Sequence, residues 1–422
     1  MYAGKLETYQ SKWESYSTAF AVFSGIQLPD LRLKKRLIQC TSSLLRRPGS
    51  AFSGAFNDWS AIKAWYRLID NHRVKSEVIM NYLGRNTALQ SQSRQRIYAV
   101  SDTTEISLPN TQIRENMGYG TYCKESRAFF VHSTLAVDAS GVPLGLLHQK
   151  SWKRDDSQHG RRVKRAKLPI EEKESYKWIE SIAGTLDCFK ACESIPEIVM
   201  LGDRESDIFE YFEAIHHHQI HAIIRSAHNR RIENADGLLW DHVNDMKASC
   251  QVSFTVPRRF QKRSRNVQLS IKYATGLYLK KPHQLRGNLQ SIPVNLILVE
   301  EIDSKNSKDA ICWRILTTLP ICSGQEAWQI AQQYKYRWLV EEFHYILKSG
   351  CRIEKLQFRT FERYVKALTI LSEVSLELLR FKYLARRKPD LPAADFLPAD
   401  NLYVLRLKAK MNRWRAPPEP MT

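Results

Sequence analysis

The segment from Tyr334 to Gly350, "YKYRWLVEEFHYILKSG", places the strongest constraint on how this chain folds. Four polar residues in it are separated by three, four and seven positions: Tyr334, Arg337, Glu341 and Lys348. Because a helix advances about 100° per residue, these spacings bring the four side chains to one stripe. Apolar residues fall on the opposite side, which we expect to pack on a core. The polar stripe is then either an ordinary solvated face with charge pairing or a functional surface.

The charge of the chain indicates its partner. The 422 residues include 64 Lys and Arg against 44 Asp and Glu, a formal net charge of +20. A globular chain this basic favours a polyanion, because each neutralised phosphate releases condensed counterions. An anionic membrane surface is the alternative, but the sequence has no basic amphipathic anchor, lipidation signal, secretory signal or long apolar run. We therefore expect a cytoplasmic protein without a membrane partner.

Residues that commonly bind transition metals do not form a recognisable motif. The eight cysteines are scattered without a C-x-x-C pair, which indicates reduced thiols and no zinc module. The run from His216 to His218, with His221, ends a predicted helix and lacks a matching group of ligands. We assign no metal to it.

The N-terminal 75 residues are predicted to be helical and basic. The segments 28–50 and 59–74 carry apolar residues at helical spacing. No acidic residue balances the cations between positions 31 and 49, which favours phosphate contact over an ordinary solvated helix face. The residues that we assign to DNA contact are Arg32, Arg36, Lys63 and Arg67.

The central part of the chain mixes strand and helix patterns. Residues 95–108 are expected to contain a strand that ends at Asp102, and residues 129–152 a hairpin. Helical periodicity over 171–192 then precedes a short apolar strand at 198–201. This order of elements predicts an α/β fold with helices on the faces of a sheet.

Three carboxylates occupy comparable places in this pattern. Asp102 and Asp203 each follow a predicted strand, and Glu341 lies on the polar stripe. Carboxylates at strand ends can converge on one sheet edge and bind Mg²⁺, and two such ions support phosphoryl transfer. Each aspartate also has a structural interpretation, because Asp203 could cap the next helix and Asp102 could close an Asx turn. Only their combination with the polar stripe favours catalysis.

Several ordered motifs carry a family resemblance. The segment "YKYRWLVEEFHYILK" matches the pattern Y-x2-R-x3-E-x6-K, while "SDTTEISL" and "GDRESDIFEYF" resemble two aspartate motifs. The sequence thus resembles the DDE transposases of the insertion-sequence-four family, in particular the transposon-five type. "LPDLRLKKRLI" with "KAWYRLIDN" is similar to the N-terminal end-binding domain of that family.

The resemblance implies an RNase H-like catalytic domain in which Asp102, Asp203 and Glu341 hold two Mg²⁺ ions, with Mn²⁺ as a possible substitute. It implies cut-and-paste transposition through hairpin ends, at the terminal inverted repeats of an insertion sequence, by a homodimer on double-stranded DNA. Trp313 matches a tryptophan that receives a flipped base, although a core aromatic is the alternative interpretation. The residues that match DNA contacts of the family are Tyr334, Arg337, Lys348, Arg225 and Trp313.

Residues and resemblance together divide the chain into five parts. These are a helical N-terminal DNA-binding domain (1–75), the first part of the catalytic domain (76–235), a β-rich insertion (236–311), the second part of the catalytic domain with the Glu341 helix (312–390), and a short C-terminal tail (391–422). The transposon-five type continues into a helical pairing domain, so we expect either a truncated chain or pairing through other surfaces. The competing functions are an end-binding regulator without full synapsis and a nuclease without strand transfer.

Overall fold

A computed structural model describes residues 18–50, 52–56, 58–108, 117–121, 127–158, 168–233, 236–256, 264–282, 290–302, 310–387, 390, 392 and 399–411. The chain divides into two compact units. The first unit comprises Met1–Ser91, Thr103–His159 and Glu341–Thr422, and the second comprises Gln92–Asp102 and Gly160–Val340. The boundaries fall inside strand β1 (Arg96–Ser107) and helix α11 (Trp338–Tyr345), so both elements run from one unit into the other.

Helices α2 (Leu31–Arg46), α3 (Phe52–Ala55), α4 (Trp59–Asp70) and α5 (Ser76–Ser91) begin the first unit. Aspartates cap two of them, because Asp30 accepts a hydrogen bond from the N–H of Arg32 and Asp58 accepts one from the N–H of Ala61, each at 2.8 Å. The apolar faces of α2 and α4 are buried, which confirms the helical periodicity of the N-terminal sequence.

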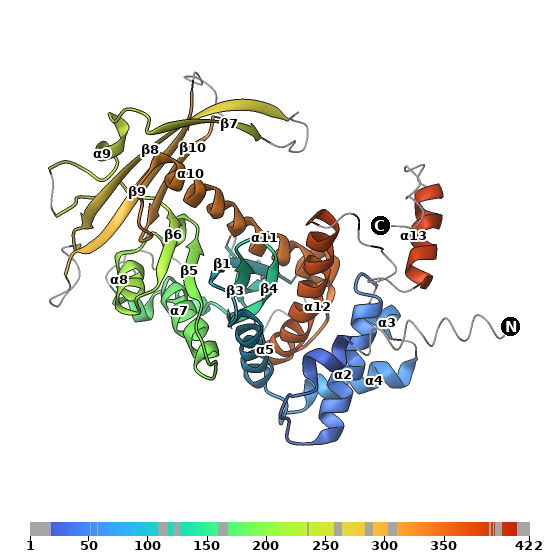
Figure 1. Ribbon diagram of the computed structural model, residues 1–422. Helices are drawn as coiled ribbons and strands as arrows, with labels where there is room; N and C mark the ends of the chain where they lie inside the picture. Colours follow the sequence, from blue (N-terminus) through green and yellow to red (C-terminus); the bar gives the residue numbers. More distant parts are fainter. Residues whose placement is uncertain are drawn as a thin grey trace. The chain divides into compact units, whose positions relative to one another are not determined.

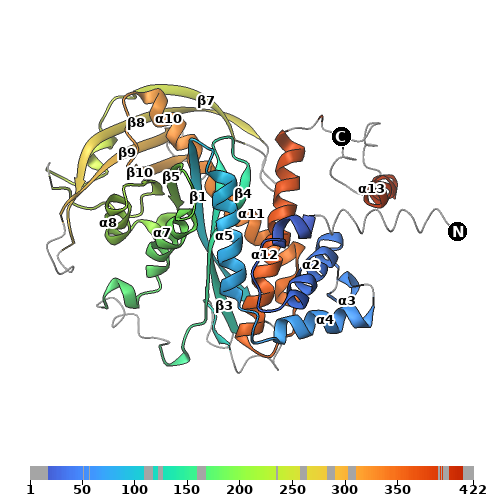
Figure 2. The same cartoon turned by 60° about the horizontal axis from the view of Figure 1, so that its bottom comes forward.

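The first unit also contains strands β2 (Gly118–Tyr119), β3 (Arg127–Asp138) and β4 (Pro143–Trp152), and helices α12 (Phe361–Arg387) and α13 (Ala399–Met411). Strands β3 and β4 pair antiparallel, which confirms the predicted hairpin. Its turn uses Gly141 at a φ of 85°, a conformation that glycine adopts without a steric penalty. Helix α5 packs along β3 and β4, and α12 packs against α2, α4 and β4 (Figure 2).

The second unit contains the start of β1 and strands β5 (Glu197–Gly202), β6 (His221–Arg225), β7 (Cys250–Val256), β8 (Arg265–Leu279), β9 (Ile292–Glu301) and β10 (Cys312–Thr317). Strands β1, β5 and β6 are parallel, whereas β10, β9, β8 and β7 continue antiparallel from β6. Its helices are α7 (Tyr176–Phe189), α8 (Phe209–His217), α9 (Asp241–Asn244) and α10 (Gly324–Gln333) (Figure 1).

The strands form one mixed sheet in the order β2-β3-β1-β5-β6-β10-β9-β8-β7, with β4 paired to β3. The fold is therefore α/β, with a large mixed sheet and flanking helices, as the sequence predicted. One strand boundary was wrong. Strand β1 continues past Asp102 to Ser107, because the β-branched residues Thr103, Thr104 and Ile106 extend its pattern. Asp102 consequently lies within a strand and not in an Asx turn.

The segment from Tyr334 to Gly350 is not one uniform helix. It consists of a 3-10 helix η5 (Tyr334–Arg337), then α11, then a π-helix η6 (Ile346–Gly350). The wide turn ends with the N–H of Cys351 donating to the carbonyl of Ile346 at 2.7 Å. The apolar side predicted for this segment is nevertheless buried at Leu339, Val340, Phe343 and Leu347.

Candidate functional site

In the second unit, two carboxylates lie at equivalent positions on neighbouring parallel strands. Strands β1 and β5 are parallel, with Val100 opposite Leu201, so Asp102 and Asp203 each lie two residues further along. Strand β6 is parallel to β5 and ends at Arg225. Parallel strands bring their carboxyl ends to one edge of a sheet, where loops and strand ends commonly build a site.

Asp102 is paired with an arginine of the polar stripe. Nη1 of Arg337 lies 3.5 Å from Oδ2 of Asp102, and the side chains of Arg337 and Asp102 are only 16% and 18% exposed. Such an ion pair is not the fully solvated charge of an ordinary helix surface, because burial weakens screening by water. The structure thus brings together two residues that the sequence assigned to the site from positions 235 residues apart.

Asp203 has both a structural and an electrostatic role. Its Oδ1 accepts a hydrogen bond from the N–H of Glu205 at 2.8 Å and caps the 3-10 helix η4 (Arg204–Ser206), which confirms the capping interpretation. Burial, the largest cause, raises the pKa of the Asp203 carboxyl, while Arg337 and Lys177 partly lower it. A carboxyl in this environment gains ionised character when a cation approaches.

Tyr334 and Arg225 belong to the same electrostatic neighbourhood. The guanidinium of Arg337 lies 5.9 Å from the centroid of the Tyr334 ring. Burial raises the pKa of the Tyr334 hydroxyl, and Arg337 and Arg225 oppose that rise. Arg225 donates to the carbonyl of Cys312 at 2.5 Å, and burial lowers the pKa of its guanidinium. Arg337 therefore acts on both Asp203 and Tyr334, and Arg225 acts on Tyr334, so these side chains belong to one electrostatic neighbourhood.

The sequence analysis missed the residue that fixes the loop after Arg225. The carboxylate of Asp207 is completely buried, accepts hydrogen bonds from the N–H groups of Ala227 (2.7 Å) and His228 (3.1 Å), and forms an ion pair with Arg230. Buried charges persist when they are paired and hydrogen-bonded in this way. The signal was present in the sequence, because Asp207 lies in the same acidic motif as Asp203 and the loop is basic.

Trp313 lies on β10 and is half-buried, opposite Val299 of β9. It is therefore not an interior aromatic of the core, which was the alternative interpretation. The next residue, Arg314, places its guanidinium 4.7 Å from the centroid of Trp240. Trp240 in turn donates from Nε1 to the hydroxyl of Ser226 at 2.9 Å. Two tryptophans and an arginine thus lie beside the strand end that carries Arg225.

In the first unit, Glu341 and Lys348 are both half-buried. Glu341 is in the first turn of α11. Nζ of Lys348 donates to the carbonyl of Glu105 at 2.9 Å and lies 3.4 Å from a carboxylate oxygen of Glu354. Lys348 therefore contacts β1 at Glu105, which is three residues after Asp102 in the sequence. Among the positions assigned from the polar stripe, all four are at least partly buried, unlike a solvated helix face.

A buried polar network supports α11 in the same unit. Nε2 of His344 lies 3.1 Å from the hydroxyl of Ser133 on β3. Gln149 on β4 donates to Ser133 at 3.1 Å and to Ser372 on α12 at 3.0 Å. Burial lowers the pKa of His344 to about 3, so its ring is neutral near pH 7. The network joins α11 to two strands and to α12.

The N-terminal basic residues lie on two helices. Arg32 is 88% exposed and pairs with Asp30 at 3.2 Å, whereas Arg36 is half-buried. Lys63 and Arg67 are exposed on α4, and Nζ of Lys63 lies 5.5 Å from the centroid of Trp59. Two aromatic side chains beside these cations were not predicted as surface residues: Trp59 and Tyr66 are 65% and 41% exposed. Their spacing of seven places both aromatics on one helix face with the two cations.

The three carboxylates are oxygen donors of the kind that divalent cations prefer. Within the described part of the chain, no three His, Cys, Asp or Glu side chains form a group that could hold a metal ion. The fit to a cation rests instead on Asp203. Burial raises the pKa of this carboxyl, and a bound cation would lower it by stabilising the ionised form. The residues present are thus chemically suited to Mg²⁺, and their role as ligands belongs to the proposal below.

Carboxylates and arginines on neighbouring strands, in a chain with a basic helical N-terminal region, are features expected of an enzyme that acts on DNA. Two family matches specify the class. Residues 17–74 match the transposase DNA-binding family, and residues 94–372 match the transposase DDE domain. The second match spans more than half of the chain, so the protein belongs to the DDE transposase family. Its mixed sheet with flanking helices is the RNase H-like fold expected from the sequence.

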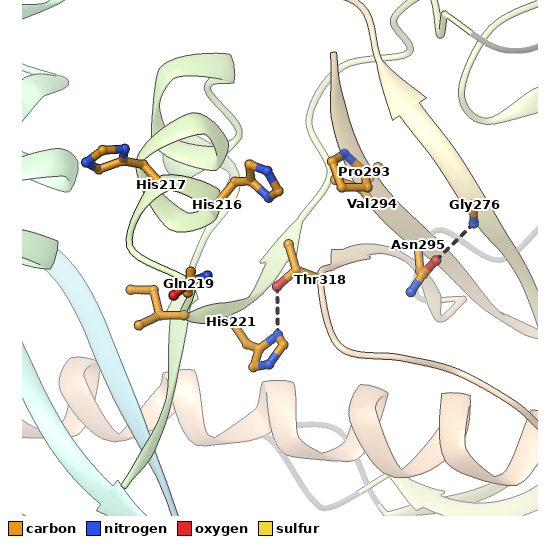
Figure 3. A pocket seen from close by; sticks show the side chains of 10 residues that line it. His216, His217, Gln219, His221, Gly276, Pro293, Val294, Asn295 and Thr318 are labelled. Carbon is orange, nitrogen blue, oxygen red and sulfur yellow. Dashed lines mark hydrogen bonds between the residues drawn. The ribbon is translucent and has the colours of Figure 1, made fainter. Parts of the chain in front are cut away.

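A separate cavity of about 570 Å³ lies at the other end of β6 (Figure 3). His221, the first residue of β6, places Nδ1 3.3 Å from the hydroxyl of Thr318, and His216 and His217 line the same cavity. Asn295 accepts a hydrogen bond from the N–H of Gly276 at 3.2 Å. The residues that line this cavity do not include Asp102, Asp203 or Arg337. It lies at the start of β6, whereas Arg225 is at the end of that strand.

Proposed function

We propose that this protein is a DNA transposase of the insertion-sequence-four family and the transposon-five type. It binds the terminal inverted repeats of its insertion sequence and excises the element by cut-and-paste cleavage through hairpin ends. The observation that carries this proposal is the half-buried pair of Asp102 and Arg337 beside Asp203, within a chain of the DDE transposase family. The freed 3′-OH of the element then joins target DNA.

The proposed catalytic residues are Asp102, Asp203 and Glu341, which together would hold two Mg²⁺ ions that Mn²⁺ can replace. When bound, such ions activate the attacking oxygen and stabilise the leaving oxygen of phosphoryl transfer. Asp203 can act as a ligand only in its ionised form, and its raised pKa opposes that form at low pH. Arg337 and Lys348 hold the scissile phosphate through charge-assisted hydrogen bonds, and the Tyr334 hydroxyl donates to a neighbouring phosphate oxygen.

The remaining assigned residues bind DNA away from the reacting phosphate. Arg32, Arg36, Lys63 and Arg67 contact the phosphates of the terminal repeat through the N-terminal helices. Arg225 contacts the strand near the cut, and Trp313 stacks on an extruded base, an interaction worth roughly 1–3 kcal/mol. The active complex is a homodimer on double-stranded DNA. We place the reaction at the bacterial nucleoid because its substrate is DNA. In the described residues, no helix is long and apolar enough to span a bilayer.

The test is a reaction of the purified full chain with Mg²⁺ and DNA that carries the inverted repeats flanking its own gene. We expect nicked, hairpin-ended and joined products, and we expect Glu341→Gln to abolish all three while it still binds the ends. Glu342→Gln is the matched control, because Glu342 is the adjacent acid on α11 and pairs with Lys382 at 2.9 Å. End binding by the wild-type chain without any product would instead identify an end-binding regulator. Cleavage without joining would identify a nuclease.

A further inference from the structure

The C-terminal end of α4 is held by a lysine from a distant part of the chain. A helix leaves its last carbonyl groups without partners inside the helix. At this end of α4, the carbonyls of Ile69 and Asn71 both accept hydrogen bonds from Nζ of Lys366, at 3.0 and 2.8 Å. A cation at this place also interacts favourably with the helix dipole. Lys366 lies in the second turn of α12, almost 300 residues further along the chain.

Two more contacts join α4 to the start of α12 and to the residues just before it. Nε of Arg363 lies 2.7 Å from Oδ1 of Asp70, the last residue of α4. The ring of Tyr66 meets that of Phe358 in a T-shaped arrangement with centroids 6.1 Å apart. We call Lys366 and Arg363 the α4 clamp. Charge-assisted hydrogen bonds are directional, so the clamp fixes the angle of α4 in a way that apolar packing alone would not.

Helix α12 also contacts the segment that follows Glu341. It packs against η6, and the hydroxyl of Ser375 lies 3.2 Å from Sγ of Cys351, the residue after η6. The side chain of Ser372 joins the network that includes His344 of α11. Lys366 and Ser375 are nine residues apart on one continuous helix, which is roughly 14 Å along its axis. One rigid element therefore connects α4 to the segment that carries Glu341 and Lys348.

We infer that Lys366 and Arg363 are positioning residues, which set the distance between the bound end sequence and the phosphodiester that is cut. The inference rests on the proposed function, in which α4 contacts the terminal repeat and Glu341 takes part in cleavage. A clamp of this kind explains why a helix whose exposed face carries Trp59, Lys63 and Arg67 has its end anchored on α12. Loosening the clamp leaves the DNA-contacting side chains unchanged but frees α4 to shift relative to the cut.

The experiment uses the full chain with Lys366→Met, which keeps the aliphatic stem and removes the N–H donors. End binding should stay within about threefold of wild type, because no DNA-contacting residue of α4 changes. The cleavage rate should fall about 10- to 100-fold, as expected for a displacement of about 1 Å, and the cuts should spread to neighbouring phosphodiesters. Lys366→Arg should restore much of the rate and the position of the cut.

Lys75→Met is the matched control, because Lys75 is a nearby cation that acts on Lys366 through charge alone. It should not move the cut. A wild-type cleavage rate and cut position in Lys366→Met would overturn the inference. A fall in end binding that matches a fall in the stability of the variant would also overturn it. If Lys366→Met does not fold, Arg363→Gln answers the same question, and an unchanged cut position in that variant overturns the inference.

Failure of the proposed function can be told apart from failure of the clamp. If the wild-type chain makes no cut, the distance between spin labels at Lys63 and Tyr345 is measured in a background without reactive cysteines. Tyr345 is 69% exposed and lies on α11, so a label there is accessible. A narrow distance distribution that broadens in Lys366→Met supports the clamp, whereas identical distributions overturn it.

Discussion

At the scale of single residues, Asp203 combines a capping bond with an unfavourable environment for its charge. Burial raises the pKa of this carboxyl, and the nearby cations only partly reverse the rise. A carboxylate that only capped a helix would gain from being ionised and solvated. In the proposed function, a proton and a metal cation would compete for the oxygens of Asp203.

This competition predicts how cleavage depends on pH. The acid limb of the cleavage rate should lie above the ordinary Asp pKa of 3.8, because the raised pKa keeps Asp203 protonated to higher pH. Raising the Mg²⁺ concentration should move the limb to lower pH, since metal binds the deprotonated form. Cleavage rates between pH 5 and 8 at two Mg²⁺ concentrations measure this, with end binding over the same range as the control. A limb that does not respond to Mg²⁺ would contradict the assignment.

Asp207 gives a second prediction at the residue scale. Asp207→Asn removes a fully buried charge and leaves Arg230, which is 17% exposed, without its ionic partner. Breaking a buried pair by removing one member typically costs about 3–5 kcal/mol, and Asn retains part of the hydrogen bonding, so we expect a loss of about 3 kcal/mol. The urea midpoint should fall, and Arg204→Gln, a substitution at an exposed neighbour, should change it little. Equal midpoints for the two variants would contradict this account of the loop.

At the scale of secondary structure, α11 and α12 contain two buried groups with opposite effects on stability. Burial lowers the pKa of His344 from 6.5 to about 3, whereas burial raises the pKa of Glu373 on α12 from 4.5 to about 7. Between pH 6.5 and 4.5 the unfolded chain takes up a proton at His344 that the folded protein does not. Over the same range the folded protein holds a proton on Glu373 that the unfolded chain releases.

The variants of these two residues should therefore respond to acid in opposite directions. As pH falls from 6.5 to 4.5, Glu373→Gln should lose stability, by up to about 1.4 kcal/mol per pH unit, because the His344 effect is no longer offset. His344→Gln should gain stability over the same interval. Urea midpoints measured at intervals across this range test both signs, and the wild type should change less than either variant. Parallel curves for all three proteins would show that neither group has the environment described.

At the scale of the whole molecule, the net charge of +20 favours electrostatic attraction to DNA. Lys63 and Arg67 are exposed on one face of α4, where each can neutralise one phosphate. The double variant Lys63→Gln/Arg67→Gln should reduce the slope of log K against log salt by about 1.8, because each phosphate contact contributes about 0.9. Lys190→Gln, a 77% exposed cation outside the N-terminal region, is the control. An unchanged slope in the double variant would remove α4 from the DNA interface.

Much of the fold followed from local patterns. Apolar runs located β3, β4 and the short strand β5, of which β3 and β5 are buried along almost their whole length. Helical periodicity located the amphipathic α2 and α4, because each of these helices buries one face. The boundary of β1 was wrong, because Asp102 was interpreted as a strand end although the β-branched residues after it continue the strand. The three helical types between Tyr334 and Gly350 were also missed, because segments of 4 and 5 residues are too short for apolar spacing to distinguish one helix type from another.

The sequence by itself determined the residue types and spacings of the carboxylates and cations, the basic N-terminal helices and the family resemblance, because chemistry and periodicity are local properties. Only the tertiary structure decided which of these groups meet. The pairing of Asp102 with Arg337, the burial of Asp207 beneath its loop and the hold of Lys366 on the end of α4 all join residues far apart in the chain. Such contacts depend on strand order and helix packing, which single-residue patterns do not encode.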